Sequence, residues 1–255
     1  MHNNNSIQGY SIAAVLFDMD GVVTDTAEAH FHAWKHVFDG FLTQQAANRE
    51  SDQKASRPFT ADDYRDHVDG KSRLDGIRAF LGARQLAVGD AAIEMLADRK
   101  NSAFQNWLSS NRVQTYDGSV ELFHGLRAQH LPFAVFTASK NAERVLESAG
   151  IRDLIAVLVD GHVAATRGLR GKPAPDTLLE AASMLGVEPS HTAVLEDAYA
   201  GVEAARAGGF EPIIGIAHGR KHDHFFDHGA HLVVDDPTEL ALFPAARLGS
   251  HRNGT

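Results

Sequence analysis

Six short apolar runs limit the folds open to this chain more than any other feature of its sequence. Each has the length of a buried strand and contains the β-branched or aromatic residues that favour strands. Helix-like stretches separate most of the runs, and alternating strands and helices predict a parallel sheet in an α/β fold. The runs are residues 12–17, 132–136, 154–159, 192–195, 212–216 and 231–234.

The stretch between residues 26 and 112 has a different character. Long amphipathic segments at 27–41 and 91–108 occur there with no convincing strand between them, which predicts an all-helical insertion. Within it, residues 43–58 are polar and rich in Gln, Asn, Ser and Lys, which indicates an exposed loop. We therefore expect a discontinuous core domain (1–26 and 113–255) and a helical cap domain (27–112).

Composition excludes several classes of protein. A hydrophobic fraction of 44% and a charged fraction of 22% are typical of globular proteins, and a net charge of -9 disfavours nucleic acid and anionic lipid as partners. No run approaches the roughly 18 apolar residues of a membrane helix, and the first residues lack a signal-peptide pattern. We expect a cytoplasmic monomer. The absence of cysteine leaves oxygen or imidazole as ligands for any metal.

Two aspartates follow the first predicted strand directly, in the sequence Asp18-Met19-Asp20-Gly21. Loops after the carboxyl ends of parallel strands are where such sheets bind ligands. A calcium loop is excluded because its glycine stands at the sixth position, whereas Gly21 is the fourth residue here. Taken alone, the pair fits either an acidic turn or a catalytic loop.

Further polar motifs follow later strands: Thr137-Ala138-Ser139-Lys140-Asn141, Gly171-Lys172-Pro173 and Glu196-Asp197. A phosphoryl group repels a carboxylate, so attack by Asp18 requires cations and hydrogen-bond donors, which Lys172 and Thr137 can supply. Mg²⁺ prefers oxygen ligands, and a suitable set is Asp18, Glu196, Asp197 and the carbonyl of Asp20. Together the motifs predict magnesium-dependent phosphoryl transfer.

The order and placement of these motifs resemble those of the haloacid dehalogenase-like superfamily. The resemblance implies a Rossmann-like core with a parallel sheet and an inserted helical cap. It also implies that Asp18 attacks phosphorus to give an aspartyl phosphate, while Asp20 acts as general acid and base. Lys172 and Thr137 complete the predicted catalytic set.

Residues 18–34 resemble more specifically the opening of the β-phosphoglucomutase family. The resemblance implies that a cap closes over the site and that Arg73 grips the distal phosphate of the substrate, a task that suits its planar guanidinium. Trp34 also fits plain core packing, because large aromatic residues are commonly buried. The implied substrate-binding residues are Thr26, His30, Trp34, Gly70, Arg73, Lys100, Asn101, Ala138, Ser139, Lys140 and Asn141.

The activity implied by this resemblance is interconversion of β-D-glucose 1-phosphate and glucose 6-phosphate through glucose 1,6-bisphosphate. The alternative is a sugar-phosphate phosphatase of the same fold, in which water attacks the aspartyl phosphate. A non-catalytic sugar-phosphate-binding protein is a distant alternative. The chain departs from the family at the polar segment 43–58, which lengthens the cap, and at Gly76, where the family usually has Ser.

Two other motifs suggest a nucleotide site and a metal site, but neither has the features that such a site needs. Gly70-Lys71-Ser72 resembles the end of a nucleotide-binding P-loop, but Arg65 stands where its first glycine belongs and no strand is predicted before it. Five histidines fall at positions 218, 222, 224, 228 and 231, which suggests a metal site. A surface loop in a histidine-rich chain is the preferred interpretation.

Overall fold

The computed structural model of the chain describes residues 6–7, 9–48, 57–240 and 242–243. Parallel strands form a six-stranded sheet in the order β5-β4-β3-β6-β7-β8. Each strand lies within one of the predicted apolar runs or extends it by one residue, so the predicted α/β fold is confirmed. The strands are β3 (Ala14–Asp18), β4 (Phe133–Phe136), β5 (Val157–Val159), β6 (Thr192–Glu196), β7 (Ile213–Ile216) and β8 (Leu232–Val234).

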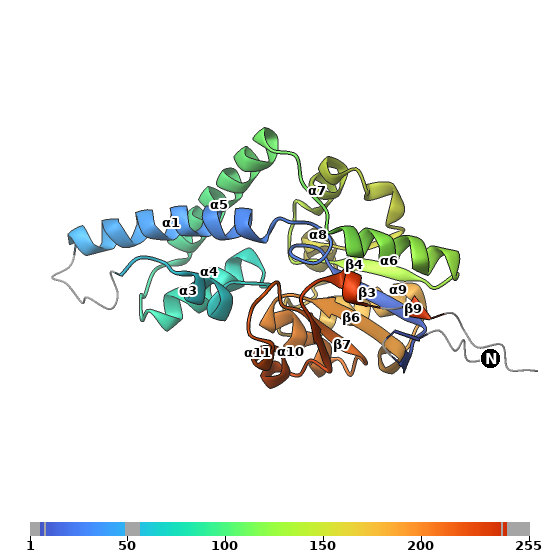
Figure 1. Cartoon of the computed structure of the whole chain (residues 1–255). Coiled ribbons are helices and arrows are strands. Elements are labelled where there is room, and N and C mark those ends of the chain that lie inside the picture. The colour runs from blue at the N-terminus through green and yellow to red at the C-terminus, as the bar shows by residue number, and fades with distance from the viewer. Residues whose placement is uncertain (1–5, 8, 49–56, 241, 244–255) are drawn as a thin grey trace, which may run out of the picture.

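Helices cover both faces of this sheet, which explains why its central strands β3 and β6 are buried along their whole length and are apolar except at their ends. On one face, Val15 and Phe17 pack in a cluster with α6 (Asp117–Ala128) and α7 (Ala142–Ala149). On the other, Leu16 packs with α9 (Asp176–Leu185), α10 (Tyr199–Ala207) and α11 (His222–His228). Figure 1 shows α6 and α7 above the sheet and α10 and α11 below it.

The carboxyl ends of β3, β4 and β6 lie side by side because these strands are parallel neighbours. Asp18 at the end of β3 pairs with Phe136 at the end of β4, and Phe17 pairs with Leu195 of β6. This register places Asp18, Thr137 and Glu196 at one edge of the sheet. In open α/β sheets, that edge is where ligands bind.

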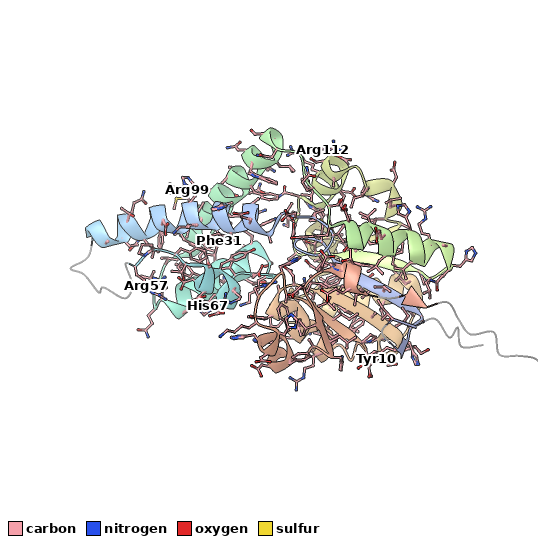
Figure 2. All side chains as sticks on the ribbon, in the orientation of Figure 1. Tyr10, Phe31, Arg57, His67, Arg99 and Arg112 are labelled. Atoms are coloured by element: carbon pink, nitrogen blue, oxygen red, sulfur yellow. The ribbon has the colours of Figure 1, made fainter. Side chains whose placement is uncertain are left out.

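A second group of helices lies to one side of the sheet, and we call this group the cap (Figure 1). It consists of α1 (Ala27–Asn48), α3 (Ala61–His67), α4 (Arg73–Ala83) and α5 (Asp90–Ser110). The cap has an apolar core of its own, in which the ring centroids of Phe38 and Phe80 lie 4.2 Å apart. Phe31 on α1, labelled in Figure 2, packs against Tyr64 of α3 with ring centroids 5.7 Å apart.

The predicted exposed loop at 43–58 is partly wrong. Residues 43–48 continue α1 as a helix, and Thr43 donates a hydrogen bond from its hydroxyl to the carbonyl of Asp39 one turn earlier. Polar residues on the exposed end of a helix give the same compositional signal as a loop. Residues 49–56 lie outside the described part of the chain, and the domain boundaries and the monomeric state stay predictions.

A small antiparallel sheet near the chain ends escaped the sequence analysis. It contains β1 (Ser6–Ile7), β2 (Tyr10–Ser11) and β9 (Leu242–Phe243) in the order β2-β1-β9. Strands of two residues carry too little periodicity to be recognised from sequence. Across the described ranges of the chain, no helix combines the length and the apolarity that crossing a membrane requires.

A buried ion pair joins two helices of the cap. The guanidinium of Arg84 lies 2.7 Å from the carboxylate of Asp63, and both side chains are almost fully buried. Asp63 also caps α3, because its carboxylate accepts hydrogen bonds from the backbone amide and the hydroxyl of Thr60. Loss of Arg84 would leave a buried carboxylate without its main cationic partner.

We therefore predict that Arg84→Leu lowers the free energy of unfolding by about 3–5 kcal/mol, the usual cost of removing one member of a buried pair. Urea denaturation measures this change. The control is Arg78→Leu, because the exposed guanidinium of Arg78 lies 3.8 Å from Asp90 and should contribute less than about 1 kcal/mol. Equal losses in the two variants would contradict the prediction.

Candidate functional site

The ammonium group of Lys172 is the central contact at the carboxyl edge of the sheet. Its Nζ lies 2.6 Å from Oδ1 of Asp18 and also donates a hydrogen bond to Oε1 of Glu196. Burial alone would lower the pKa of Lys172, but the two carboxylates outweigh burial and raise it. The lysine therefore stays charged next to Asp18, as the predicted attack on phosphorus requires.

Three buried carboxylates gather around this lysine. Oxygen atoms of Asp18, Glu196 and Asp197 all lie within 4.8 Å of one another. Burial, and then the charges of Glu196 and Asp20, raise the pKa of Asp18 well above its usual value despite the opposing charge of Lys172. Burial, and then the charge of Asp69, likewise raise the pKa of Asp197. Such crowding of like charges is relieved by a bound cation.

Two glycines make room for these carboxylates. Gly21 has φ of +90°, and a Cβ there would overlap the carboxylate of Asp197. A Cβ at Gly201, in the first turn of α10, would overlap the carboxylate of Glu196. The lack of a side chain at Gly21 and Gly201 thus leaves the space that the carboxylates of Asp197 and Glu196 occupy.

The carboxylate of Asp20 points away from this cluster and toward the cap. Its Oδ1 accepts a hydrogen bond from the hydroxyl of Thr26 at 2.5 Å, and its Oδ2 accepts one from Thr137 at 3.2 Å. Nε2 of His30 lies 3.3 Å from Oδ1. Burial acts to raise the pKa of Asp20, but His30 and Thr26 together lower it to about 2.

A lysine of the cap stands behind His30. Nζ of Lys100 lies 2.6 Å from Nδ1 of His30 and about 5 Å from the ring centroids of Trp34 and Phe104. Burial, and then the charge of Arg73, lower the pKa of Lys100 to about 7. Burial and the charge of Lys100 also lower the pKa of His30. Lys100, His30 and Asp20 thus form a chain from the cap to the catalytic loop.

A second contact between cap and core runs through Asn101. Its side-chain oxygen accepts hydrogen bonds from Arg73 of the cap at 2.8 Å and from Asn141 of the core at 3.1 Å. The backbone amide of Asn141 in turn donates a hydrogen bond to the hydroxyl of Ser139. Asn101, a cap residue implied by resemblance, therefore contacts the core loop that follows β4 and also holds Arg73.

These groups surround a small cavity of about 70 Å³ between cap and core. Most of the predicted site residues line it, whereas Thr26, Asn101, Glu196 and Lys140 do not. Lys140 instead faces an adjoining cleft of about 1030 Å³. The predicted residues that line the cavity are Asp18, Asp20, His30, Trp34, Gly70, Arg73, Lys100, Thr137, Ala138, Ser139, Asn141, Lys172 and Asp197.

Several residues around Gly70 line the cavity without having been predicted from the sequence, namely Tyr64, Val68, Asp69 and Lys71. Burial raises the pKa of Asp69 to about 6, and the charge of Asp69 contributes to the raised pKa of Asp197 in the core. Position next to Gly70 was the signal available for Asp69 and Lys71. Tyr64 lies on α3, and its approach to the cavity depends on how the cap packs on the core.

The sequence of this chain is similar to those of known proteins over most of its length. The family model described as haloacid dehalogenase-like hydrolase matches residues 12–209. A β-phosphoglucomutase of Mycobacterium bovis is 38% identical over 242 residues, which cover 90% of this chain and 91% of that protein. The chain belongs to the haloacid dehalogenase-like family.

Other relatives widen the range of activities in the family. A fructose-1-phosphate phosphatase of Escherichia coli is 31% identical and spans 79% of this chain and 95% of its own length. A crystal structure of β-phosphoglucomutase from Clostridium difficile has a TM-score of 0.72 at 24% identity and covers 89% of this chain and 92% of that one. This likeness shows the fold that the haloacid dehalogenase-like family shares, and the predicted resemblance is confirmed.

The low pKa of Lys100 makes the free energy of unfolding depend on pH. Its pKa is about 7 in the folded protein and 10.5 in the reference state, so between these values the unfolded chain binds more protons. Folding therefore becomes more favourable as the pH rises from 7 toward 10, by up to about 1.4 kcal/mol per pH unit.

We predict that Lys100→Met abolishes this rise, because methionine has a similar shape and no proton to release. The measurement compares the free energy of unfolding of wild type and variant between pH 7 and pH 10. A difference between the two that stays constant with pH would contradict the prediction.

Proposed function

We propose that the protein is a magnesium-dependent β-phosphoglucomutase that interconverts β-D-glucose 1-phosphate and glucose 6-phosphate. The observation that carries the proposal is the approach of the cap to Asp20, since His30 of the cap lies 3.3 Å from that carboxylate and Lys100 contacts His30 from behind. The 38% identity to a β-phosphoglucomutase over nine-tenths of the chain supports this choice of activity. The partner is accordingly a small phosphorylated sugar.

The acidic cluster suits Mg²⁺. Asp18, Glu196 and Asp197 offer carboxylate oxygens within 4.8 Å of one another, and the carbonyl of Asp20 is the fourth proposed ligand. Burial, and then neighbouring negative charge that a divalent ion would offset, raise the pKa values of Asp18 and Asp197. Bound there, Mg²⁺ supplies positive charge that screens Asp18 from the phosphoryl group.

Asp18 is the proposed nucleophile. An oxygen of its carboxylate forms a bond to phosphorus while the bond between phosphorus and the sugar oxygen breaks. Lys172 keeps the carboxylate in place at the end of β3 and neutralises charge beside it. Thr137 contributes a hydroxyl at the same edge of the sheet, where it already contacts Asp20.

Asp20 is the proposed general acid and base. It takes a proton from the sugar hydroxyl that attacks the aspartyl phosphate, which restores Asp18, and then gives that proton to the sugar oxygen that departs when Asp18 is phosphorylated again. Hydrogen bonds from Thr26 and Thr137 fix the direction of its carboxylate. Its low pKa means that the carboxylate is ionised and ready to accept the hydroxyl proton.

Transfer to a sugar rather than to water requires a closed site. The contacts of Asn101 with Arg73 and Asn141 hold cap and core together around the cavity, and we propose that Arg73 binds the distal phosphate of the bisphosphate. A sugar-phosphate phosphatase is the competing proposal, and the E. coli fructose-1-phosphate phosphatase among the relatives favours it. The two activities differ only in the group that attacks the aspartyl phosphate.

One assay separates these two activities. The protein is incubated with Mg²⁺, β-glucose 1-phosphate and a trace of glucose 1,6-bisphosphate, while glucose 6-phosphate and inorganic phosphate are followed separately. We predict glucose 6-phosphate without matching phosphate release, and loss of all turnover in Asp18→Asn. Stoichiometric phosphate release without isomerisation would refute the mutase, and an active Asp18→Asn variant would refute the aspartyl-phosphate route.

A further inference from the structure

His218 differs from the other histidines of its segment. His222 contacts Asp235 at 3.1 Å and His228 contacts Glu203 at 2.7 Å, both on the surface. His218 instead points inward, and its Nε2 lies 2.6 Å from the carbonyl oxygen of Gly21. That carbonyl belongs to the residue directly after Asp20. A carbonyl can only accept, so Nε2 of His218 carries the proton in this contact.

The turn that contains Gly21 depends on donors from outside it. Three consecutive carbonyls receive hydrogen bonds: Gly21 from His218, Val22 from the hydroxyl of Ser119 at 2.6 Å, and Val23 from the amide of Tyr116 at 3.1 Å. Within the turn, the amide of Gly21 donates to the carbonyl of Thr24 at 2.8 Å. The carbonyl that His218 holds belongs to the peptide between Gly21 and Val22, so the contact fixes the backbone that directly follows Asp20.

The ring of His218 is itself held in place. It stacks on Tyr116 with centroids 4.6 Å apart and an interplanar angle of 26°, and the Tyr116 hydroxyl donates to Asp25 at 3.2 Å. Asp25 lies just before α1, where the chain passes from core to cap. His218 has a positive φ of 49°, a conformation that is uncommon for residues other than glycine and that costs free energy.

We infer that His218 is a positioning residue that orients Asp20 for proton transfer by holding the carbonyl of Gly21. The inference rests on the proposed function, because it assumes that Asp20 protonates the departing sugar oxygen. His218 touches neither the substrate nor Asp20 itself. Its effect should therefore appear only in steps that need a proton from Asp20.

The leaving group provides the test. An alkoxide leaving from a sugar phosphate requires a proton, whereas acetate leaving from acetyl phosphate does not. Phosphorylation of Asp18 is measured by rapid quench with glucose 1,6-bisphosphate and, separately, with acetyl phosphate. His218→Ala should slow the first reaction roughly ten- to hundredfold, as a small misplacement of a catalytic group does. The second reaction should change by less than about twofold.

Two further variants complete the design. His218→Gln keeps an N–H donor and should recover most of the rate with the bisphosphate. His222→Ala removes an exposed histidine of the same segment and should leave both rates unchanged. Equal slowing of both donors, no slowing at all, or no recovery in His218→Gln would overturn the inference while Asp18 is still phosphorylated. A wild type that neither donor phosphorylates would overturn the proposed function itself.

Discussion

The buried ammonium of Lys172 lies between the carboxylates of Asp18 and Glu196, and the catalytic edge of the sheet is organised around this contact. Charged groups are buried at high cost unless they are paired, so each of the three side chains constrains the other two. Glu196 is fixed further by the amide of Ala198, which donates to its second oxygen at 2.9 Å. The network joins the ends of β3 and β6 to the loop before α9, and it leaves Asp18 facing the cavity.

The groups around the cavity come from the core and from the cap, which has an apolar cluster of its own while α1 and α5 also pack in the cluster of the core. Asp18 and Lys172 both belong to the core, so the proposed phosphorylation of Asp18 depends mainly on groups at the carboxyl ends of the strands. Asp20 is a core residue with partners in both core and cap, since Thr137 lies in the core and His30 in the cap. In the proposed mechanism, proton transfer by Asp20 therefore depends on contact between cap and core, which would link closure of the cavity to the choice of acceptor.

The sequence was sufficient for the sheet because buried parallel strands are continuous apolar runs, and the core motifs follow them directly. It failed for residues 43–48, where a polar helix end has the composition of a loop. It also missed Tyr64, Asp69 and His218, because their place near the site depends on the packing of cap and loops rather than on local pattern. Lys140 was expected in the catalytic pocket but lines the adjoining cleft, a distinction that side-chain direction decides.

The central claim is that the Asp18 carboxylate becomes phosphorylated. Acid quenching during turnover, followed by borohydride reduction, converts an aspartyl phosphate to homoserine, and peptide mass spectrometry then locates the converted residue. The account predicts homoserine at position 18 and nowhere else, dependent on Mg²⁺ and on a phosphoryl donor. Turnover without homoserine at position 18, or with the converted residue at another aspartate, would contradict it.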